Sequence, residues 1–102
     1  METQLAGLKV DVNNEGYLTD FSQWNREVGE QIAAAEGIVM TPRHWEVIEW
    51  LQQQVQAGKE LSIRGIKKSG VIDIKEFYAL FPGGPLKVST KIAGVPKPKS
   101  CI

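Results

Sequence analysis

The chain has 102 residues, of which 42% are hydrophobic and 24% are charged, and this composition indicates one small globular domain rather than a disordered chain. No stretch approaches the roughly 20 apolar residues of a membrane-spanning helix, and no basic region leads into an apolar one at the start, so we expect a cytoplasmic protein without a signal peptide. The single cysteine, Cys101, excludes an internal disulfide, and with His44 as the only histidine it supplies too few ligands for a structural zinc site.

The formal charge is zero but is unevenly distributed along the chain. Residues 1–57 carry nine acidic and three basic side chains, whereas residues 58–102 carry three acidic and nine basic ones. The basic half is suited to an acidic protein face or to a polyanion such as RNA. The uneven distribution is equally consistent with two halves that pack together in the fold, so that their opposite charges offset one another.

The first half of the sequence predicts a hairpin and two helices. Alternation broken by turn residues predicts a β-hairpin within residues 8–18. Periodic apolar residues predict a helix that begins at Thr19 or Asp20 and ends at Gly37, and a second helix that has Thr41 as its cap and stops at Gly58. The predicted apolar faces of these helices comprise Phe21, Trp24, Val28, Ile32 and Ala35 in the first and Trp45, Ile48, Leu51 and Val55 in the second.

The second half predicts three shorter helices and an arm. Ser62 begins a helix that closes at Ser69-Gly70, Asp73 and Glu76 form a capping box for a helix through Phe81, and residues 86–93 form the last helix. Residues 94–102 hold two prolines and no apolar periodicity, which predicts a flexible arm that spans about 30 Å when extended. We therefore expect a mainly α protein, a small helical bundle with an N-terminal β-hairpin, in which residues 1–93 form the body and residues 94–102 the arm.

Few residues outside the arm indicate chemistry. The sequence lacks a phosphate-binding GxxxxGK[ST] loop, a GxGxxG turn and a paired-histidine metal motif, so we expect no self-contained enzyme. His44 near a helix start is interpreted as a structural or surface residue, and Trp24 and Trp45 as core residues. Trp50 lies off the apolar stripe and is equally consistent with core packing and with a partner surface.

Cys101, the next-to-last residue, is the candidate reactive group. A free thiol has an ordinary pKa of about 8.5, and Lys97 and Lys99 favour the thiolate while the C-terminal carboxylate opposes it. Such a thiolate can take the terminal sulfur of a donor persulfide and pass it to an acceptor, carried by a mobile arm. An incidental exposed cysteine near a terminus is equally consistent with these residues alone.

Several runs of the sequence are typical of one family. They comprise Leu80-Phe81-Pro82-Gly83-Gly84-Pro85, Lys91-Ile92-Ala93-Gly94-Val95-Pro96-Lys97-Pro98 and Cys101-Ile102 at the C-terminal end, with Gly16-Tyr17-Leu18, Trp24, Glu36-Gly37-Ile38, His44-Trp45-Glu46-Val47 and Arg64 upstream. Together these runs resemble the DsrC/TusE family over nearly the whole chain. Residues 54–74 depart most from the family pattern and form a shorter stretch than is usual.

The resemblance implies a helical bundle with a helix-turn-helix-like arrangement and a cysteine-bearing arm. In members tied to dissimilatory sulfite reductase, a second cysteine precedes the penultimate one by eleven positions, where this chain has Thr90. The resemblance therefore implies a TusE-like sulfurtransferase role in which Cys101 holds a transient persulfide and no resident cofactor is needed. It implies a TusBCD/DsrEFH-type complex as donor, a tRNA 2-thiouridylase as acceptor, and contacts to the thiol or a partner from Arg64, Lys91, Lys97 and Lys99.

Two alternatives remain open at this stage. A DsrC-like protein of sulfur oxidation or sulfite reduction, with sulfite reductase as its partner, has the same features. A nucleic-acid-binding module is the other, because residues 63–81 can form a helix-turn-helix with phosphate contacts from Arg64, Lys67, Lys68 and Lys75. A further hypothesis is that Cys101 rests against Arg64 in the free protein, which would stabilise the thiolate.

Overall fold

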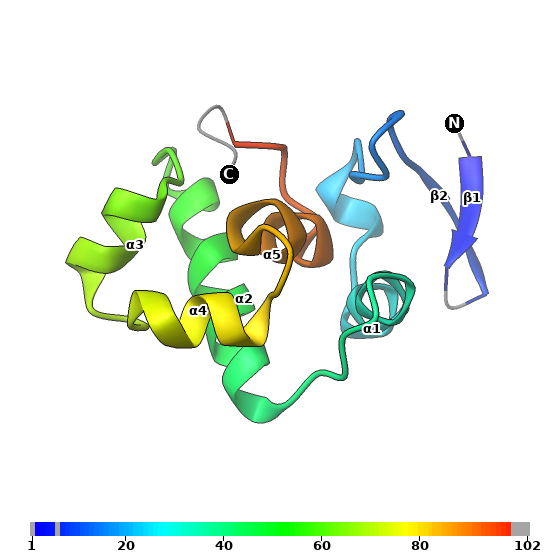
Figure 1. Ribbon diagram of the computed structural model, residues 1–102. Coiled ribbons are helices and arrows are strands. Elements are labelled where there is room, and N and C mark those ends of the chain that lie inside the picture. Colours follow the sequence, from blue (N-terminus) through cyan, green and yellow to red (C-terminus); the bar gives the residue numbers. More distant parts are fainter. Residues whose placement is uncertain (1, 6, 99–102) are drawn as a thin grey trace.

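The computed structural model describes residues 2–5 and 7–98, which form a two-stranded hairpin and a bundle of helices (Figure 1). The mainly α fold with an N-terminal hairpin is confirmed. No helix in the described ranges is long and apolar enough to cross a membrane. The elements are β1 (Glu2–Leu5), β2 (Leu8–Asp11), the 3-10 helix η1 (Phe21–Gln23), α1 (Arg26–Ala35), α2 (Pro42–Gln56), α3 (Ile63–Ser69), α4 (Ile74–Leu80) and α5 (Pro85–Ala93).

The hairpin uses a different first strand from the one predicted. β2 pairs antiparallel with β1, with Thr3 opposite Val10, whereas Leu18 makes only an isolated bridge to Val12. The cause is Asn13, whose Oδ1 accepts hydrogen bonds from the backbone N–H of residue 15 at 2.9 Å and of residue 17 at 3.1 Å. These bonds curl residues 13–17 into a loop, so the predicted hairpin within residues 8–18 is wrong in its bounds.

The first predicted helix is divided into two. Asp20 caps η1, but Trp24 is extended, with ψ 139°, and Asn25 caps a new helix, α1. The extended backbone at Trp24 lets the indole N–H donate to the carbonyl oxygen of Ile92 at 2.7 Å. A tertiary hydrogen bond and a second capping residue therefore override the periodicity that predicted one continuous helix.

Three of the remaining helices, α2, α3 and α4, begin where the sequence predicted, because each has its own polar cap. The last helix, α5, begins at Pro85 instead of the predicted residue 86, and its cap, Gly84, makes no side-chain hydrogen bond. Thr41 caps α2, Ser62 caps α3, and Asp73 caps α4. The cap of α2 also includes His44, whose Nδ1 accepts from the backbone N–H of Thr41 at 3.1 Å.

His44 joins the start of α2 to the end of α4. Since a backbone N–H can only donate, Nδ1 is the acceptor and Nε2 carries the proton, which it donates to the carbonyl oxygen of Leu80 at 2.9 Å. The ring is 6% exposed and lies edge-on to Phe81, with ring centroids 5.1 Å apart. The structural role predicted for His44 is confirmed.

Arg43 makes a second connection between the same parts of the fold. Its guanidinium group binds both carboxylate oxygens of Glu76, at 3.1 and 3.0 Å, and donates to the carbonyl oxygen of Val71 at 3.0 Å. The hydrogen bond from Arg43 holds the pKa of Glu76 below its ordinary value. Both α4 and the turn before it are thereby attached to α2.

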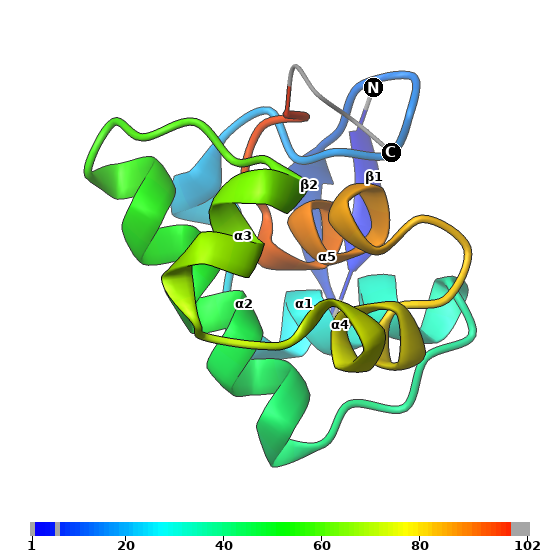
Figure 2. The same ribbon diagram turned by 60° about the vertical axis from the view of Figure 1, so that its left-hand side comes forward.

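The central element is α5, which lies between α1 and α2 (Figures 1 and 2). Seven of its nine residues are buried, including Ser89 and Thr90. Thr90 Oγ1 donates to the carbonyl oxygen of Leu86 at 2.7 Å. The hydroxyl of Tyr17 donates to the carbonyl oxygen of Lys87 at 3.0 Å. The polar groups of this core helix are therefore satisfied without water.

The packed body continues beyond the end of α5. Gly94 has φ +71°, and the N–H of Val95 donates to the carbonyl oxygen of Thr90 at 3.3 Å, which is a Schellman-type cap. Val95 is only 2% exposed, and Gln52 Nε2 donates to the carbonyl oxygen of Ala93 at 2.9 Å. The predicted reach of about 30 Å requires that all nine residues of the arm, 94–102, extend away from the body. Because Val95 is buried, only the six residues from 96 to 101 can span the distance to Cys101, which is about 20 Å at most.

The close approach of Trp24 leaves no room for a side chain at residue 94. A Cβ at residue 94 would lie 2.4 Å from Cδ1 of Trp24, whereas one at Gly58, which also has a positive φ, would meet nothing within 4 Å. We expect Gly94→Ala to lower the free energy of unfolding by about 3 kcal/mol, and Gly58→Ala by only about 1 kcal/mol. Urea unfolding followed by circular dichroism measures both, and equal losses would contradict the clash.

The Arg43–Glu76 pair predicts a pH-dependent contribution to stability. Because the pKa of Glu76 is lowered in the folded state, its contribution is present above the ordinary pKa of a glutamate and is lost as the pH falls through the lowered value. We expect Glu76→Gln to destabilise the protein at pH 7 and to match wild type near pH 2. Glu30→Gln, at an exposed position of α1, is the control, and a Glu76→Gln effect that does not change with pH would refute the ionic origin.

Candidate functional site

The structure describes the origin of the arm, whereas Cys101 and Lys99 lie outside the described residues. After α5, residues 95–98 pass the C-terminal end of α2, where Pro96 and Pro98 line a hollow together with Val55. The predicted contact between Cys101 and Arg64 also involves undescribed residues. The site is therefore built from the surface at which the arm leaves the body.

Lys91, a predicted contact of the thiol or a partner, is held on the body. Its Nζ lies 2.9 Å from Oε1 of Glu36, and its side chain is 15% exposed. The same ammonium group lies 5.7 Å from the ring centroid of Tyr17. Lys91 therefore connects the last turn of α5 to the residue that follows α1 and to the loop after the hairpin.

Lys97 connects the arm itself to the body. Its Nζ lies 2.8 Å from Oε2 of Glu15, in the loop after β2. The hydrogen bond from Lys97 lowers the pKa of Glu15, and the charges of Lys87 and Lys91 act in the same direction. This loop is the second point, after Val95, at which the body contacts the start of the arm.

Arg64 lies in a different environment from these lysines. It is exposed on α3, as are Lys67 and Lys68, and Lys75 is exposed on α4. α3 and the hairpin lie at opposite ends of the molecule (Figure 1). Lys91 and Lys97 therefore contact carboxylates toward the hairpin end, while the four basic residues of α3 and α4 are presented at the other end.

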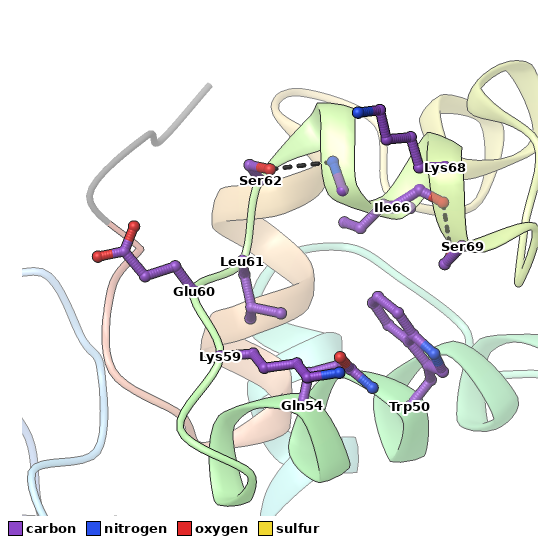
Figure 3. A pocket seen from close by; sticks show the side chains of 10 residues that line it. Trp50, Gln54, Lys59, Glu60, Leu61, Ser62, Ile66, Lys68 and Ser69 are labelled. Carbon is purple, nitrogen blue, oxygen red and sulfur yellow. Dashed lines mark hydrogen bonds between the residues drawn. The ribbon is translucent and has the colours of Figure 1, made fainter.

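Three hollows that share lining residues extend from the space between α2 and α3 to the start of the arm. One, of about 310 Å³, lies between α2 and α3, and Trp50 and Ile66 approach each other across it (Figure 3). A second, of about 180 Å³, has the arm as one wall and shares Lys59 and Leu61 with the first. A third, of about 250 Å³, shares Val55 and Pro96 with the second and is also lined by Phe21, Gln52, Gln56 and Val95. We call these three connected hollows the arm-exit surface.

The arm-exit surface is apolar at its base and carries charges of both signs at its edge, where Glu60 lines the first two hollows together with Lys59. Trp50 is half-buried and packs against the core, and Leu61 and Ile66 are buried beside it. Lys59 and Lys68 are exposed at the rim of the first hollow. One side of Trp50 thus packs on the core and the other lines a surface hollow, so its role at a partner surface stays a prediction.

Sequence reasoning missed the residues that hold the arm in place. These are Glu15 and Glu36, the partners of the two lysines, and Gln52, which binds the carbonyl oxygen of Ala93. The signal for some of them was present, because the family-like positions Tyr17, Trp24 and Glu36 all contact α5. Their common role depends on the folded position of α5.

The described residues do not form a candidate metal site. Within residues 2–5 and 7–98, no three His, Cys, Asp or Glu side chains lie close enough together to hold a metal ion. The predicted nucleophile, Cys101, follows the last described residue, Pro98, by three positions.

Comparison with known proteins assigns the family. A family model described as DsrC-like protein matches residues 4–102. Proteins named Sulfurtransferase TusE from Escherichia coli K12 and Salmonella typhimurium LT2 are 38% and 36% identical to this chain, and each alignment covers 94% of the chain and 95% of the relative.

Solved structures show the same relationship. The structure described as dissimilatory sulfite reductase I (DsrI) has 34% identity and a TM-score of 0.87, and the oxidized gamma-subunit of the dissimilatory sulfite reductase (DsrC) from Archaeoglobus fulgidus has 30% identity and a TM-score of 0.79. The solution structure of Allochromatium vinosum DsrC has 27% identity and a TM-score of 0.84, and all three matches cover 100% of both chains. With a family match from residue 4 to residue 102 and these shared structures, the chain belongs to the DsrC-like family.

Proposed function

We propose that this chain is a sulfur carrier that accepts a persulfide sulfur on Cys101 and relays it to an acceptor for 2-thiolation of the tRNA wobble uridine. The observation that carries the proposal is the family match through residue 102, which includes the penultimate cysteine, together with 38% identity to proteins named Sulfurtransferase TusE. The carrier acts as a covalent sulfurtransferase component rather than as a self-contained enzyme.

The transfer requires only thiol chemistry. The Cys101 thiolate attacks the terminal sulfur of a donor persulfide, a new S–S bond forms, and the donor cysteine leaves as a thiolate. Cys101 then carries a persulfide, whose terminal sulfur is transferred when an acceptor thiolate attacks it and releases the Cys101 thiolate. No net oxidation or reduction occurs, because the sulfane sulfur keeps its oxidation state and each step exchanges one thiolate for another.

Thr90 favours the TusE-like role over a two-cysteine cycle. It is the residue at which the two-cysteine relatives carry their second thiol, and here its hydroxyl is fully buried and donates to the carbonyl oxygen of Leu86 at 2.7 Å. A hydroxyl cannot form a disulfide with Cys101 or release its persulfide. The similarity to DsrI and DsrC keeps a single-cysteine role in sulfur oxidation or sulfite reduction as the alternative function.

The partners follow from this assignment. A TusBCD/DsrEFH-type sulfurtransferase complex is the proposed donor, a tRNA 2-thiouridylase the proposed acceptor, and the cytoplasm the proposed location. Lys91 and Lys97, which contact Glu36 and Glu15, act by fixing the arm at its origin. For Arg64 and Lys99 we propose contacts with the thiol or with a partner.

The proposal predicts a mass change confined to Cys101. After incubation with a cysteine desulfurase, cysteine and a purified TusBCD-type complex, we expect intact-protein mass spectrometry to show a gain equal to one sulfur atom that is removed by reductant. Cys101→Ser should show no gain, and the neighbouring Ser100→Ala should load as wild type does. Absence of an adduct with any sulfane donor would discard the carrier.

The nucleic-acid alternative predicts a different effect of the Cys101→Ser substitution. If α3 and α4 bind RNA or DNA through their four basic residues, affinity falls steeply with salt and survives Cys101→Ser. We expect instead that tRNA binding by the free protein is weak, and that tRNA 2-thiolation in a reconstituted relay is abolished by Cys101→Ser. Filter binding at two salt concentrations and quantitation of 2-thiouridine distinguish the two functions.

A further inference from the structure

The fixed origin of the arm limits where a partner can meet the thiol. Val95 is buried and Lys97 is paired with Glu15, so the described part of the arm is held against the body almost to its last residue, Pro98. Cys101 follows three residues later, which corresponds to about 10 Å of extended chain. A partner that offers its own persulfide must therefore bring its surface onto the surroundings of Pro98.

Those surroundings are the arm-exit surface. Its second hollow is lined by Pro98, and that hollow shares Leu61 and Lys59 with the larger one between α2 and α3. Trp50, Leu61 and Ile66 give the larger hollow an apolar base (Figure 3). A pocket of this kind, which adjoins the hollow lined by Pro98, is suited to an aromatic or branched side chain that serves as an interface anchor.

The charges around this hollow select the kind of partner. Lys59 and Lys68 are exposed on its rim and outnumber the carboxylate that also lines it, Glu60. Arg64 and Lys67 are exposed on the same helix as Lys68. Carboxylates on a partner would complement these charges and accelerate encounter. Because the donor of the sulfur is a protein cysteine, a protein surface is favoured over RNA at this place.

We propose that the arm-exit surface is the docking site for the sulfur-donating protein, whose contact patch carries an apolar side chain flanked by carboxylates. The apolar side chain enters the hollow between Trp50 and Ile66, and the carboxylates pair with Lys59 and Lys68. This inference rests on the proposed sulfur-carrier function and deepens it, because it assigns the recognition of the donor to the body and the transfer to the arm.

A charge-reversal pair tests the rim. We expect Lys59→Glu combined with Lys68→Glu to slow loading of Cys101 by a purified TusBCD-type complex at least tenfold, with loading by inorganic polysulfide unchanged because the thiol itself is unaltered. Lys9→Glu combined with Lys75→Glu makes the same change in net charge at exposed residues of β2 and α4. This control should load at the wild-type rate from both donors, and equal loading of both double variants by the complex would overturn the proposal.

A binding experiment tests the hollow without disturbing the fold. The Cys101→Ser protein should bind the TusBCD-type complex with the affinity of wild type. When the complex is added, the indole N–H signal of Trp50 in the NMR spectrum should shift. A complex that forms without shifting this signal overturns the proposal, as does a shift caused by tRNA and not by the complex. So does a shift in the free protein after removal of residues 99–102, which would make the chain's own C-terminus the occupant.

The two hypotheses fail in distinguishable ways. If wild type takes sulfur from neither donor while Cys101→Ser still binds the complex through Trp50, the sulfur-carrier function fails and the docking site stands. If wild type loads from the complex but the Lys59→Glu and Lys68→Glu pair has no effect, the function stands and the docking site fails.

Discussion

The contact between Trp24 and the end of α5 is the constraint on which the rest of the structure depends. The indole N–H binds the carbonyl oxygen of Ile92, and the ring occupies the space that a side chain at residue 94 would need. This contact requires a glycine at the end of α5 and an extended backbone at Trp24, which divides the first predicted helix. It also fixes the direction in which the chain leaves the core, so the arm begins from a defined point.

An arm that is held at its origin works differently from one that is free over its whole length. An arm that is free over nine residues can search for a partner, whereas one held as far as residue 97 presents its cysteine within a small volume. Binding then loses less chain entropy, and more of the specificity must come from the surface of the body around the arm. The mixture of apolar base and basic rim at that surface agrees with this division of tasks.

The uneven charge of the sequence has two outcomes in the fold, and each matches one interpretation that composition left open. Lys91 and Lys97 of the basic half pair with Glu36 and Glu15 of the acidic half, so part of the charge is offset internally. The basic residues of α3 and α4 remain exposed at the end of the molecule away from the hairpin. Among the described residues, the exposed basic side chains next to the arm-exit surface, apart from the paired Lys97, are therefore those of α3 and Lys59.

The sequence by itself determined the mainly α class, the starts of α2, α3 and α4 and the family, and it predicts Cys101 as the reactive residue. These features depend on local signals: a capping residue acts within one turn of a helix, and a motif is read along the chain. Only the tertiary structure decided the division at Trp24, the strand that pairs with β2, the carboxylate partners of Lys91 and Lys97, and the hollows around the arm. Each of these depends on residues far apart in sequence that approach one another only when α5 is buried between α1 and α2, and local periodicity carries no information about that approach.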